Sequence, residues 1–502
     1  MTMFKKIKNY LLVALAFTFI MSCESDDLTI PLVIEEVIPL SSGEADFSNY
    51  VALGASFTAG FTDGALFIAG QENSFPNLLA NVFANAGGGA FTQPWMNDNI
   101  GGLLLGGTLI QSPRLFFDGA GLAVVSEFPT TEVSNIIAGP FNNMGVPGAK
   151  SFHFLANGYG NVAGVALGLA NPYFARMASS SNASMLEDVM AQSPTFFTLS
   201  EIGGNDVLAY ATSGGSGIDQ TGNFDPTSYG GNDITDPNVF AQVFSNVVTT
   251  LTSNGAKGVV ANIPNITSLS YFTTVPYNAV PLDQATADQL NAAFAAYNGG
   301  LLQAESFTLI TAEERARRTI IFAAGQNAMT MIDEDLTDLS GLGLPSYRQT
   351  TTEDLLVLTS STFIGTEAIP GNPQFINGVS VPLEDKWVLT PEEQLAIKIA
   401  TDAYNITIEA VATTNGLAFI DFKSILEEAS TTGTPFDDFN MTTQLIFGGL
   451  VSLDGIHLTE KGYAFMANKF MEAIDTTYGS NFVASGSLLK ATDFKTLYPE
   501  SL

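Results

Sequence analysis

The stretch YVALGASFTAG, residues 50–60, decides the fold class. Its first four residues are apolar and end at Gly54, as expected for a strand that is buried on both faces of a parallel sheet. Comparable apolar runs recur at 196–199, 258–261 and 417–420, and a polar residue follows each of them. The stretch therefore predicts the first of several parallel strands.

Helical patterns separate these runs. Residues 283–302 repeat apolar side chains at spacings of four and three, and residues 391–413 begin with a proline suited to the first helical position. Strands that alternate with helices indicate an α/β domain with a mainly parallel sheet. Two segments do not fit this pattern, at about 87–128 and 301–389, and we expect both to be insertions near the working face.

Composition limits the possible partners and chemistry. The 502 residues include 50 acidic and 18 basic ones, for a net charge of −32, which would repel a phosphate backbone and makes nucleic acid an unsuitable partner. The single cysteine, Cys23, excludes disulfide scaffolds and cysteine-based zinc sites. The two histidines, His153 and His457, are the only candidates for a histidine base.

The N-terminus is typical of a secretory signal peptide. Three lysines precede an apolar run at 11–21, which is shorter than the roughly 20 residues needed to cross a bilayer. The run Ile-Met-Ser-Cys at 20–23 resembles a bacterial lipobox, which implies that Cys23 is lipidated after cleavage. An ordinary cleaved signal with an incidental cysteine is the alternative.

The acidic residues at 24–27 resemble the tag that sends some Bacteroidetes-type lipoproteins to the outer cell surface. The resemblance implies an outer membrane lipoprotein, held by its N-terminal lipid anchor, with the cell surface as the suggested address. The expected organisation has four parts, namely a signal peptide at 1–22, a lipidated tether at 23–46, a main domain at 47–480 and a C-terminal tail at 481–502.

Two polar segments near opposite ends of the main domain suggest nucleophilic catalysis. Ser56 follows the first predicted strand, where open α/β sheets place their ligands. Asp454 precedes His457 by three residues, a spacing that lets the carboxylate hold one ring nitrogen while the other faces a nucleophile. Each segment alone also has an ordinary structural interpretation, a turn or helix cap for Ser56 and a packed histidine for His457.

Two glycine-rich segments offer donors to an oxyanion. Asn205, in the run Gly-Gly-Asn-Asp at 203–206, can present its side-chain amide, and Gly148 can present its backbone N–H. A simple turn is the alternative interpretation of residues 203–206. His153 is near Gly148 in sequence and could reach the site, although a hydrogen-bonded scaffold role is the commoner one. Asp63 is interpreted as a turn residue.

In this order the four segments resemble the SGNH hydrolase superfamily, the GDSL-type esterases and lipases. The matching positions are Gly54 to Phe57, Gly148, Gly203 to Asp206, and Asp454 to His457, and the resemblance covers about 48–265 and 391–475. It implies a three-layer α/β/α sandwich with a five-stranded parallel sheet of flavodoxin-like type.

The resemblance also implies roles for individual residues. Ser56 is the expected nucleophile, His457 the general base and Asp454 its orienting acid, with an oxyanion hole formed by the N–H groups of Ser56 and Gly148 and the Asn205 side chain. No metal and no organic cofactor is expected. Ala55 stands where the family motif has an aspartate, which puts its supporting hydrogen bonds in doubt. Ser56 also lacks the G-x-S-x-G elbow, which argues against an α/β-hydrolase fold.

The expected activity is therefore that of a serine esterase or lipase that hydrolyses carboxylic esters through an acyl-enzyme. The Gly/Leu/Phe-rich segment 101–117 is expected to line an apolar pocket or form a lid, which mildly favours acyl or lipid-like esters. Two alternatives stay open, a carbohydrate acetylesterase in glycan uptake and a non-catalytic surface binding lipoprotein on the same scaffold.

Overall fold

The structure is a computed structural model that describes residues 38–502, and its packed unit is Leu40–Leu502. The predicted signal peptide, the lipidation site Cys23 and most of the predicted tether lie outside the described residues. Within residues 38–502, no helix combines the length and the apolar character that a bilayer crossing requires.

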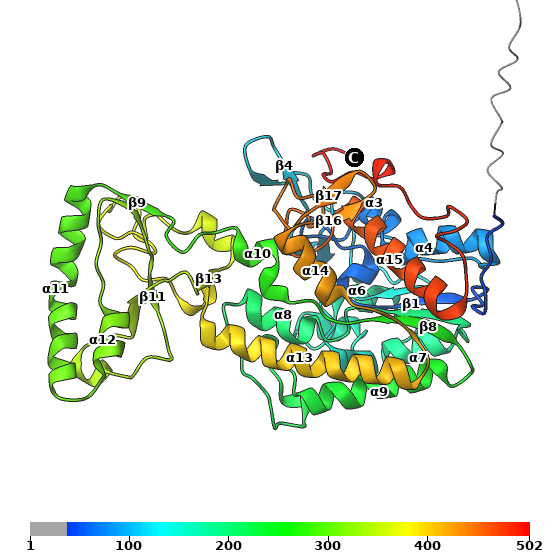
Figure 1. Ribbon diagram of the computed structural model, residues 1–502, viewed down its shortest axis with the longest axis horizontal. Coiled ribbons are helices and arrows are strands. Elements are labelled where there is room, and N and C mark those ends of the chain that lie inside the picture. The colour runs from blue at the N-terminus through cyan, green and yellow to red at the C-terminus, as the bar shows by residue number, and fades with distance from the viewer. Residues whose placement is uncertain (1–37) are drawn as a thin grey trace, which may run out of the picture. The chain divides into compact units, whose positions relative to one another are not determined.

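A five-stranded parallel sheet forms the centre of the packed unit, with the strand order β6-β1-β7-β8-β15 (Figure 1). Counted along the chain, this is the order 2-1-3-4-5. The strands are β1 (Tyr50–Gly54), β6 (Asn143–Gly145), β7 (Phe196–Leu199), β8 (Lys257–Ala261) and β15 (Ala418–Ile420). The mixed α/β class and the strands predicted from the four apolar runs are confirmed.

The sequence pattern did not predict the edge strand β6. Its sequence, Asn-Met-Gly, contains no apolar run, yet it pairs with β1 in parallel, with Gly145 opposite Gly54. Carboxamides fix it in place, because Asn142 Nδ2 donates to the Tyr50 carbonyl at 2.9 Å and Asn143 Nδ2 donates to the Thr58 carbonyl at 2.9 Å. Hydrogen bonds from side chains replace the strand propensity that these residues lack.

Long helices pack against the sheet and against each other. Helix α15 (Glu460–Tyr478) contacts α4 (Phe75–Phe83) and β15, while α13 (Pro391–Thr414) contacts α9 (Pro237–Thr252) and α8 (Asn205–Thr212). The predicted helix at 391–413 is confirmed and begins with a capping box made by Thr390 and Glu393. The apolar stripe of α15, Tyr463, Met466, Phe470 and Ile474, is buried, and Thr459 caps that helix.

Residues 275–388 form a lobe with hydrophobic clusters of its own. It contains α11 (Gln284–Ser306), α12 (Ala312–Arg318), and the strand pairs β9 (Val280–Leu282) with β10 (Gly325–Asn327), β11 (Thr330–Ile332) with β12 (Tyr347–Gln349), and β13 (Leu355–Leu356) with β14 (Val388–Leu389). The apolar residues of α11 pack into these clusters. The helix expected at 283–302 therefore belongs to the lobe, which begins earlier than the insertion boundary expected near residue 301.

The run Thr-Ile-Ile-Phe at 319–322 in this lobe is not a strand, although β-branched and aromatic residues favour one. Two asparagines of α11 take the place of a partner strand. Asn298 bonds to both backbone groups of Ile320, at 3.0 and 2.8 Å, and Asn291 bonds to both backbone groups of Phe322, at 2.8 and 2.9 Å. The backbone is satisfied by carboxamides instead of a β ladder.

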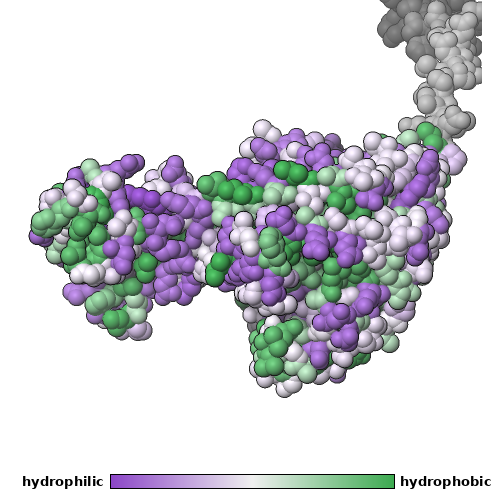
Figure 2. Space-filling view, turned by 90° about the horizontal axis from the view of Figure 1, so that it is seen from below, coloured by the Kyte–Doolittle hydropathy of each residue, from purple (hydrophilic) through white to green (hydrophobic). Residues whose placement is uncertain are grey.

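The other expected insertion, at about 87–128, contains two short hairpins, β2 (Leu103–Leu105) with β3 (Thr108–Gln111) and β4 (Leu115–Phe117) with β5 (Leu122–Val124). On the face shown in Figure 2, apolar residues form separate patches among polar ones.

Both ends of the described chain pack onto the sheet domain. Glu44, in the expected tether, donates its N–H to the Tyr478 carbonyl at 2.8 Å, so the packed unit starts before residue 47. In the expected tail, Phe482 is fully buried, and the carbonyls of Pro499 and Glu500 accept hydrogen bonds from the buried Arg114 at 2.7 and 2.8 Å. Residues 481–502 are therefore part of the folded unit.

Candidate functional site

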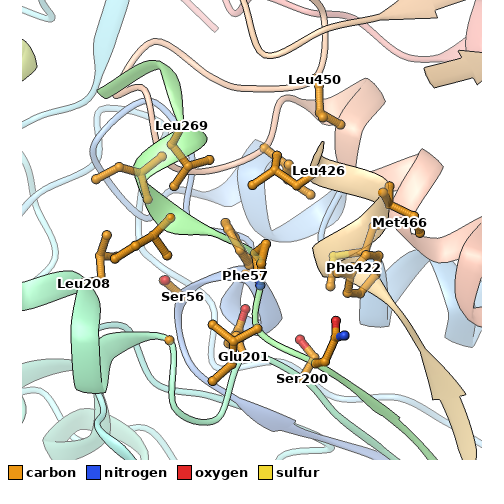
Figure 3. A pocket seen from close by; sticks show the side chains of 18 of the residues that line it. Ser56, Phe57, Ser200, Glu201, Leu208, Leu269, Phe422, Leu426, Leu450 and Met466 are labelled. Carbon is orange, nitrogen blue, oxygen red and sulfur yellow. The ribbon is translucent and has the colours of Figure 1, made fainter. Parts of the chain in front are cut away.

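A pocket lies at the carboxyl ends of β1, β7, β8 and β15, and its space unfilled by atoms, open mouth included, is about 940 Å³. In an open sheet of order 2-1-3-4-5, the strand order reverses between β1 and β7, which is where such sheets bind ligands. Its lining is mostly apolar, and Figure 3 shows Ser56 and Glu201 among side chains such as Leu208, Leu269 and Leu426.

Ser56 is the first residue of α2 (Ser56–Ala59), directly after β1, and lines the pocket. Glu201, directly after the β7 segment, holds this turn, because its Oε1 accepts hydrogen bonds from the N–H groups of Ala55 at 2.6 Å and Thr58 at 2.9 Å. Gly54 is required here, since a Cβ atom would lie 2.8 Å from that oxygen. The carboxylate therefore links the two strands that flank the switch point.

Glu201 was not singled out from the sequence. It has a left-handed backbone conformation, φ +54°, and its Oε2 is buried without a hydrogen-bond partner among the described residues. Burial raises the pKa of Glu201 to about 7, although the Thr58 and Ala55 hydrogen bonds and nearby His457 lower it. A lone acid directly after an apolar strand was the one available signal.

Asp454 and His457 form a direct pair. Asp454 Oδ1 accepts from the backbone N–H groups of Ile456 and His457 at 2.9 and 2.8 Å, which closes the turn, and Oδ2 lies 2.8 Å from His457 Nδ1. Gly455 lies in this turn with φ +77°, a left-handed conformation that favours glycine. There is also no room for a side chain, because a Cβ atom there would lie 2.8 Å from the Tyr271 nitrogen. The predicted pairing of carboxylate and imidazole is present.

This pairing fixes the state of the ring. Burial would raise the pKa of Asp454, but the charge of His457 and hydrogen bonds from His457 and Ile456 hold it well below its usual range. The carboxylate is therefore ionised and only accepts, so Nδ1 carries a proton and Nε2 is the ring nitrogen that Asp454 does not hold.

His457 is 9% exposed and packs beside the segment that carries Ser56. Its ring centroid is 5.4 Å from that of Phe57 and 4.6 Å from that of Phe61. Within residues 38–502, the Ser56 hydroxyl forms no hydrogen bond to His457 or to another group. The structure thus places Ser56 next to the residue that contacts the ring, without a hydroxyl–imidazole hydrogen bond, and His457 itself is not among the residues that line the pocket.

The turn at 60–64 is hydrogen-bonded to the segment at 453–454, which is distant in the sequence. Asp63, in a left-handed conformation with φ +51°, accepts from the Leu453 N–H at 3.0 Å, and the Gly64 N–H donates to Asp454 Oδ2 at 2.8 Å. Burial raises the pKa of Asp63 to about 7 despite the Leu453 bond. Asp63 is a turn residue, as interpreted, and it also anchors the segment that carries Asp454.

The two predicted donor segments also meet. Asn205 Nδ2 donates to the Ala149 carbonyl at 3.0 Å, next to the exposed Gly148, whose φ is +80°. Across residues 38–502, the backbone N–H groups of Ser56 and Gly148 take part in no hydrogen bond. These two N–H groups and the second amide hydrogen of Asn205 therefore stay available to a bound acceptor.

His153 does not line this pocket. Its Nδ1 accepts from the Lys150 N–H at 3.0 Å, and its ring stacks on Tyr159 with centroids 4.1 Å apart. Burial and the charge of Lys150 lower the pKa of His153 to about 3, so the ring is neutral. His153 therefore has the hydrogen-bonded scaffold role that was the commoner of its two interpretations.

The expectation that the segment 101–117 lines this pocket is wrong, since none of its residues is among the lining residues, and the lid stays a prediction. Leu115 instead donates its N–H to the Asp63 carbonyl at 2.7 Å, and Phe117 packs on Phe447 with ring centroids 6.1 Å apart. Its apolar residues support the turn beneath the site. The apolar lining comes from the loops after β7 and β8 and from the C-terminal third of the chain.

The site thus combines an unbonded hydroxyl, an imidazole whose Nε2 can accept a proton, unused N–H donors and an apolar pocket. These groups suit the attack of a hydroxyl on a carbonyl carbon whose oxygen then gathers charge. Comparisons of the chain with protein-family models, with curated proteins and with solved structures found no significant match.

Proposed function

We propose that this protein is a serine hydrolase of the SGNH type that cleaves carboxylic esters with apolar acyl groups. One observation carries the proposal, namely that the Asp454–His457 pair packs against the residue after Ser56, at a sheet edge where two backbone N–H groups are unused. Such donors are expected around a developing oxyanion.

In the proposed reaction, Ser56 Oγ attacks the ester carbonyl carbon while His457 Nε2 takes the hydroxyl proton. The carbonyl oxygen becomes an oxyanion and accepts from the Ser56 and Gly148 N–H groups and from Asn205. The C–O bond to the alcohol then breaks, and Nε2 gives the alcohol its proton. Water, deprotonated by the same nitrogen, releases the carboxylic acid and restores Ser56.

Several features support the SGNH assignment and its three-layer fold. The sheet has the order 2-1-3-4-5, and in Figure 1 α4 and α15 lie on one side of it while α9 and α13 lie on the other. The family motif has an aspartate at the position of Ala55. Here Glu201 brings a carboxylate to the same place, and its Oε1 accepts a hydrogen bond from the Ala55 N–H at 2.6 Å. The departure from the motif is thereby compensated.

The pocket favours acyl esters over acetylated sugars. Its lining contains many aliphatic and aromatic side chains and few polar ones, whereas a sugar needs several polar partners. We therefore expect faster hydrolysis of medium-chain nitrophenyl esters than of acetylated xylan. Faster release of acetate from xylan would favour the carbohydrate esterase instead.

A fluorophosphonate probe tests the nucleophile. It should label the full chain at Ser56, found by mass spectrometry of the peptides, and Ser56→Ala should lose the label and about 10⁴–10⁶-fold in kcat. The matched control is Ser228→Ala, because Ser228 is exposed and outside the pocket. An unlabelled wild-type chain without esterase turnover would favour the non-catalytic binding protein.

For location, we propose an outer membrane lipoprotein anchored through Cys23, the sole cysteine of the chain. Radioactive palmitate should label the wild-type protein in a bacterial host, and Cys23→Ala should be unlabelled and leave the membrane fraction. Equal membrane association of both forms would contradict the anchor.

A further inference from the structure

A second group of acidic side chains lies where the lobe rejoins the sheet domain. Glu334 follows β11, Asp385 begins a short 3-10 turn before β14, and Glu393 lies in the first turn of α13. One carboxylate oxygen from each residue lies within 4.8 Å of the other two. Three carboxyl groups from separate segments thus converge on one point.

Within residues 38–502, these three groups have no cationic partner. Their neighbours are paired, since Glu384 bonds to Lys386 at 2.6 Å and Glu392 bonds to Arg317 at 3.2 Å. Among the residues that the structure describes, no lysine, arginine or histidine forms an ion pair with Glu334, Asp385 or Glu393. The neighbouring acids Glu384 and Glu392 thus have cationic partners, whereas the three converging acids have none among the described residues.

Glu393 provides an independent indication of a missing ligand. Its side chain is 6% exposed, and Oε2 accepts from the Thr390 N–H at 2.7 Å. Its other oxygen, Oε1, is buried with no hydrogen-bond partner in the described part of the chain. Burial of an unpartnered carboxylate oxygen costs several kcal/mol unless a cation or a proton neutralises it.

We propose that Glu334, Asp385 and Glu393 bind a calcium ion. All the donors are oxygens, which excludes the sulfur and nitrogen sets that zinc and copper prefer. Calcium takes oxygen ligands at about 2.3–2.6 Å in flexible geometry, so one ion reaches oxygens almost 5 Å apart, and water completes its shell. Magnesium, with shorter bonds of about 2.0–2.1 Å and a strict octahedron, fits three separate segments less well.

The ion would join segments from different parts of the fold. Glu334 belongs to the lobe, whereas Glu393 belongs to α13. The C-terminal end of α8 touches the same place, because a Cβ atom on Gly215 would lie 1.9 Å from Glu393 Oε1. Helix α8 begins with Asn205, so the ion would steady the element that carries a proposed oxyanion donor. The binding itself does not depend on the proposed hydrolase activity.

Calcium titration of the purified full chain tests the proposal. After treatment with a chelator, calorimetry at physiological salt should show one site with a Kd of about 10⁻⁶–10⁻³ M, the range of sensor and extracellular sites. Saturating calcium should raise the Tm by several degrees. The absence of a calcium-dependent heat and Tm shift would overturn the proposal, and binding of magnesium at equal affinity would overturn the assignment to calcium.

Variants separate the site from general binding to an acidic surface. Glu393→Gln and Asp385→Asn should each weaken calcium binding at least about tenfold and lose most of the Tm shift. Without calcium, both variants should melt above the wild type, because repulsion is relieved. Glu384→Gln, a neighbour outside the group, is the matched control and should bind as the wild type does. Unchanged affinity in both site variants would refute the site.

Discussion

The pocket at the sheet edge and the acidic group at the lobe differ in which polar groups are left over. Around Asp454 each carboxylate oxygen has an N–H donor, and N–H groups at Ser56 and Gly148 remain unused. Around Glu393, in the part of the chain that the structure describes, a carboxylate oxygen has no hydrogen-bond donor and no cationic side chain forms an ion pair. Spare donors suit an electron-rich ligand, and spare acceptors suit a cation. The unmatched groups therefore indicate the sign of what each region binds.

The strongest test of this contrast changes the carboxylate that the imidazole needs. Asp454→Asn should lower kcat by about 10⁴-fold, because an amide no longer holds the proton on Nδ1 of His457. Esterase kinetics with a medium-chain ester measure the change. Asp475→Asn is the matched control, since Asp475 also accepts backbone N–H bonds, from Phe482 and Val483 at 2.8 and 2.9 Å, but lies on the opposite end of α15. Equal losses in both variants would indicate instability instead.

The next test removes one of the spare donors. Asn205→Ala should lower kcat by about 10²–10³-fold with little change in KM, because an oxyanion donor acts mainly in the transition state. Asn157→Ala provides the control, as its exposed carboxamide also donates to a backbone carbonyl, at 2.8 Å. A loss confined to KM would assign Asn205 to substrate binding and contradict the surplus of donors.

The smallest expected effect concerns the stability of the fold against pH. The pKa of Glu201 is about 7 in the folded protein, above its ordinary value of 4.5, so the folded state holds the proton more tightly. The stability that Glu201 provides is therefore present below pH 4.5 and is lost as the pH rises through 7.

Between pH 5 and 8, the Tm of the wild type should fall by about 2–5 °C more than that of Glu201→Gln. Calcium is kept constant in these melts, so that the lobe carboxylates do not contribute to the difference. Glu187→Gln is the control, because the pKa of the exposed Glu187 is lowered by Ser184 and the group stays ionised throughout this range. Parallel curves for the wild type and Glu201→Gln would show that Glu201 does not titrate there.

The sequence predicted what depends on local pattern. Apolar runs located β1, β7, β8 and β15, and a proline suited to the first helical position located the start of α13. The spacing of Asp454 and His457 predicted their hydrogen bond, because both belong to one turn. Structural features that depend on a few neighbouring residues could be predicted from the sequence.

The features that the sequence did not predict depend on distant partners. β6 is held by asparagine side chains, and residues 319–322 are held by asparagines of α11 instead of a neighbouring strand. Glu201 gains its place only because β7 lies beside β1, and the group around Glu393 exists only once the lobe folds back onto α13. The spacing of these residues along the sequence does not indicate that they contact each other in the fold.

The bond between Gly64 and Asp454 joins positions 390 residues apart, and it has a consequence for biosynthesis. A ribosome finishes Ser56 and Asn205 long before it reaches His457, and much of the apolar lining, from Phe422 to Met466, is made only around the same time as the histidine. A nascent or truncated polypeptide would hold a hydroxyl without a base, and the catalyst would stay silent until translation is nearly complete.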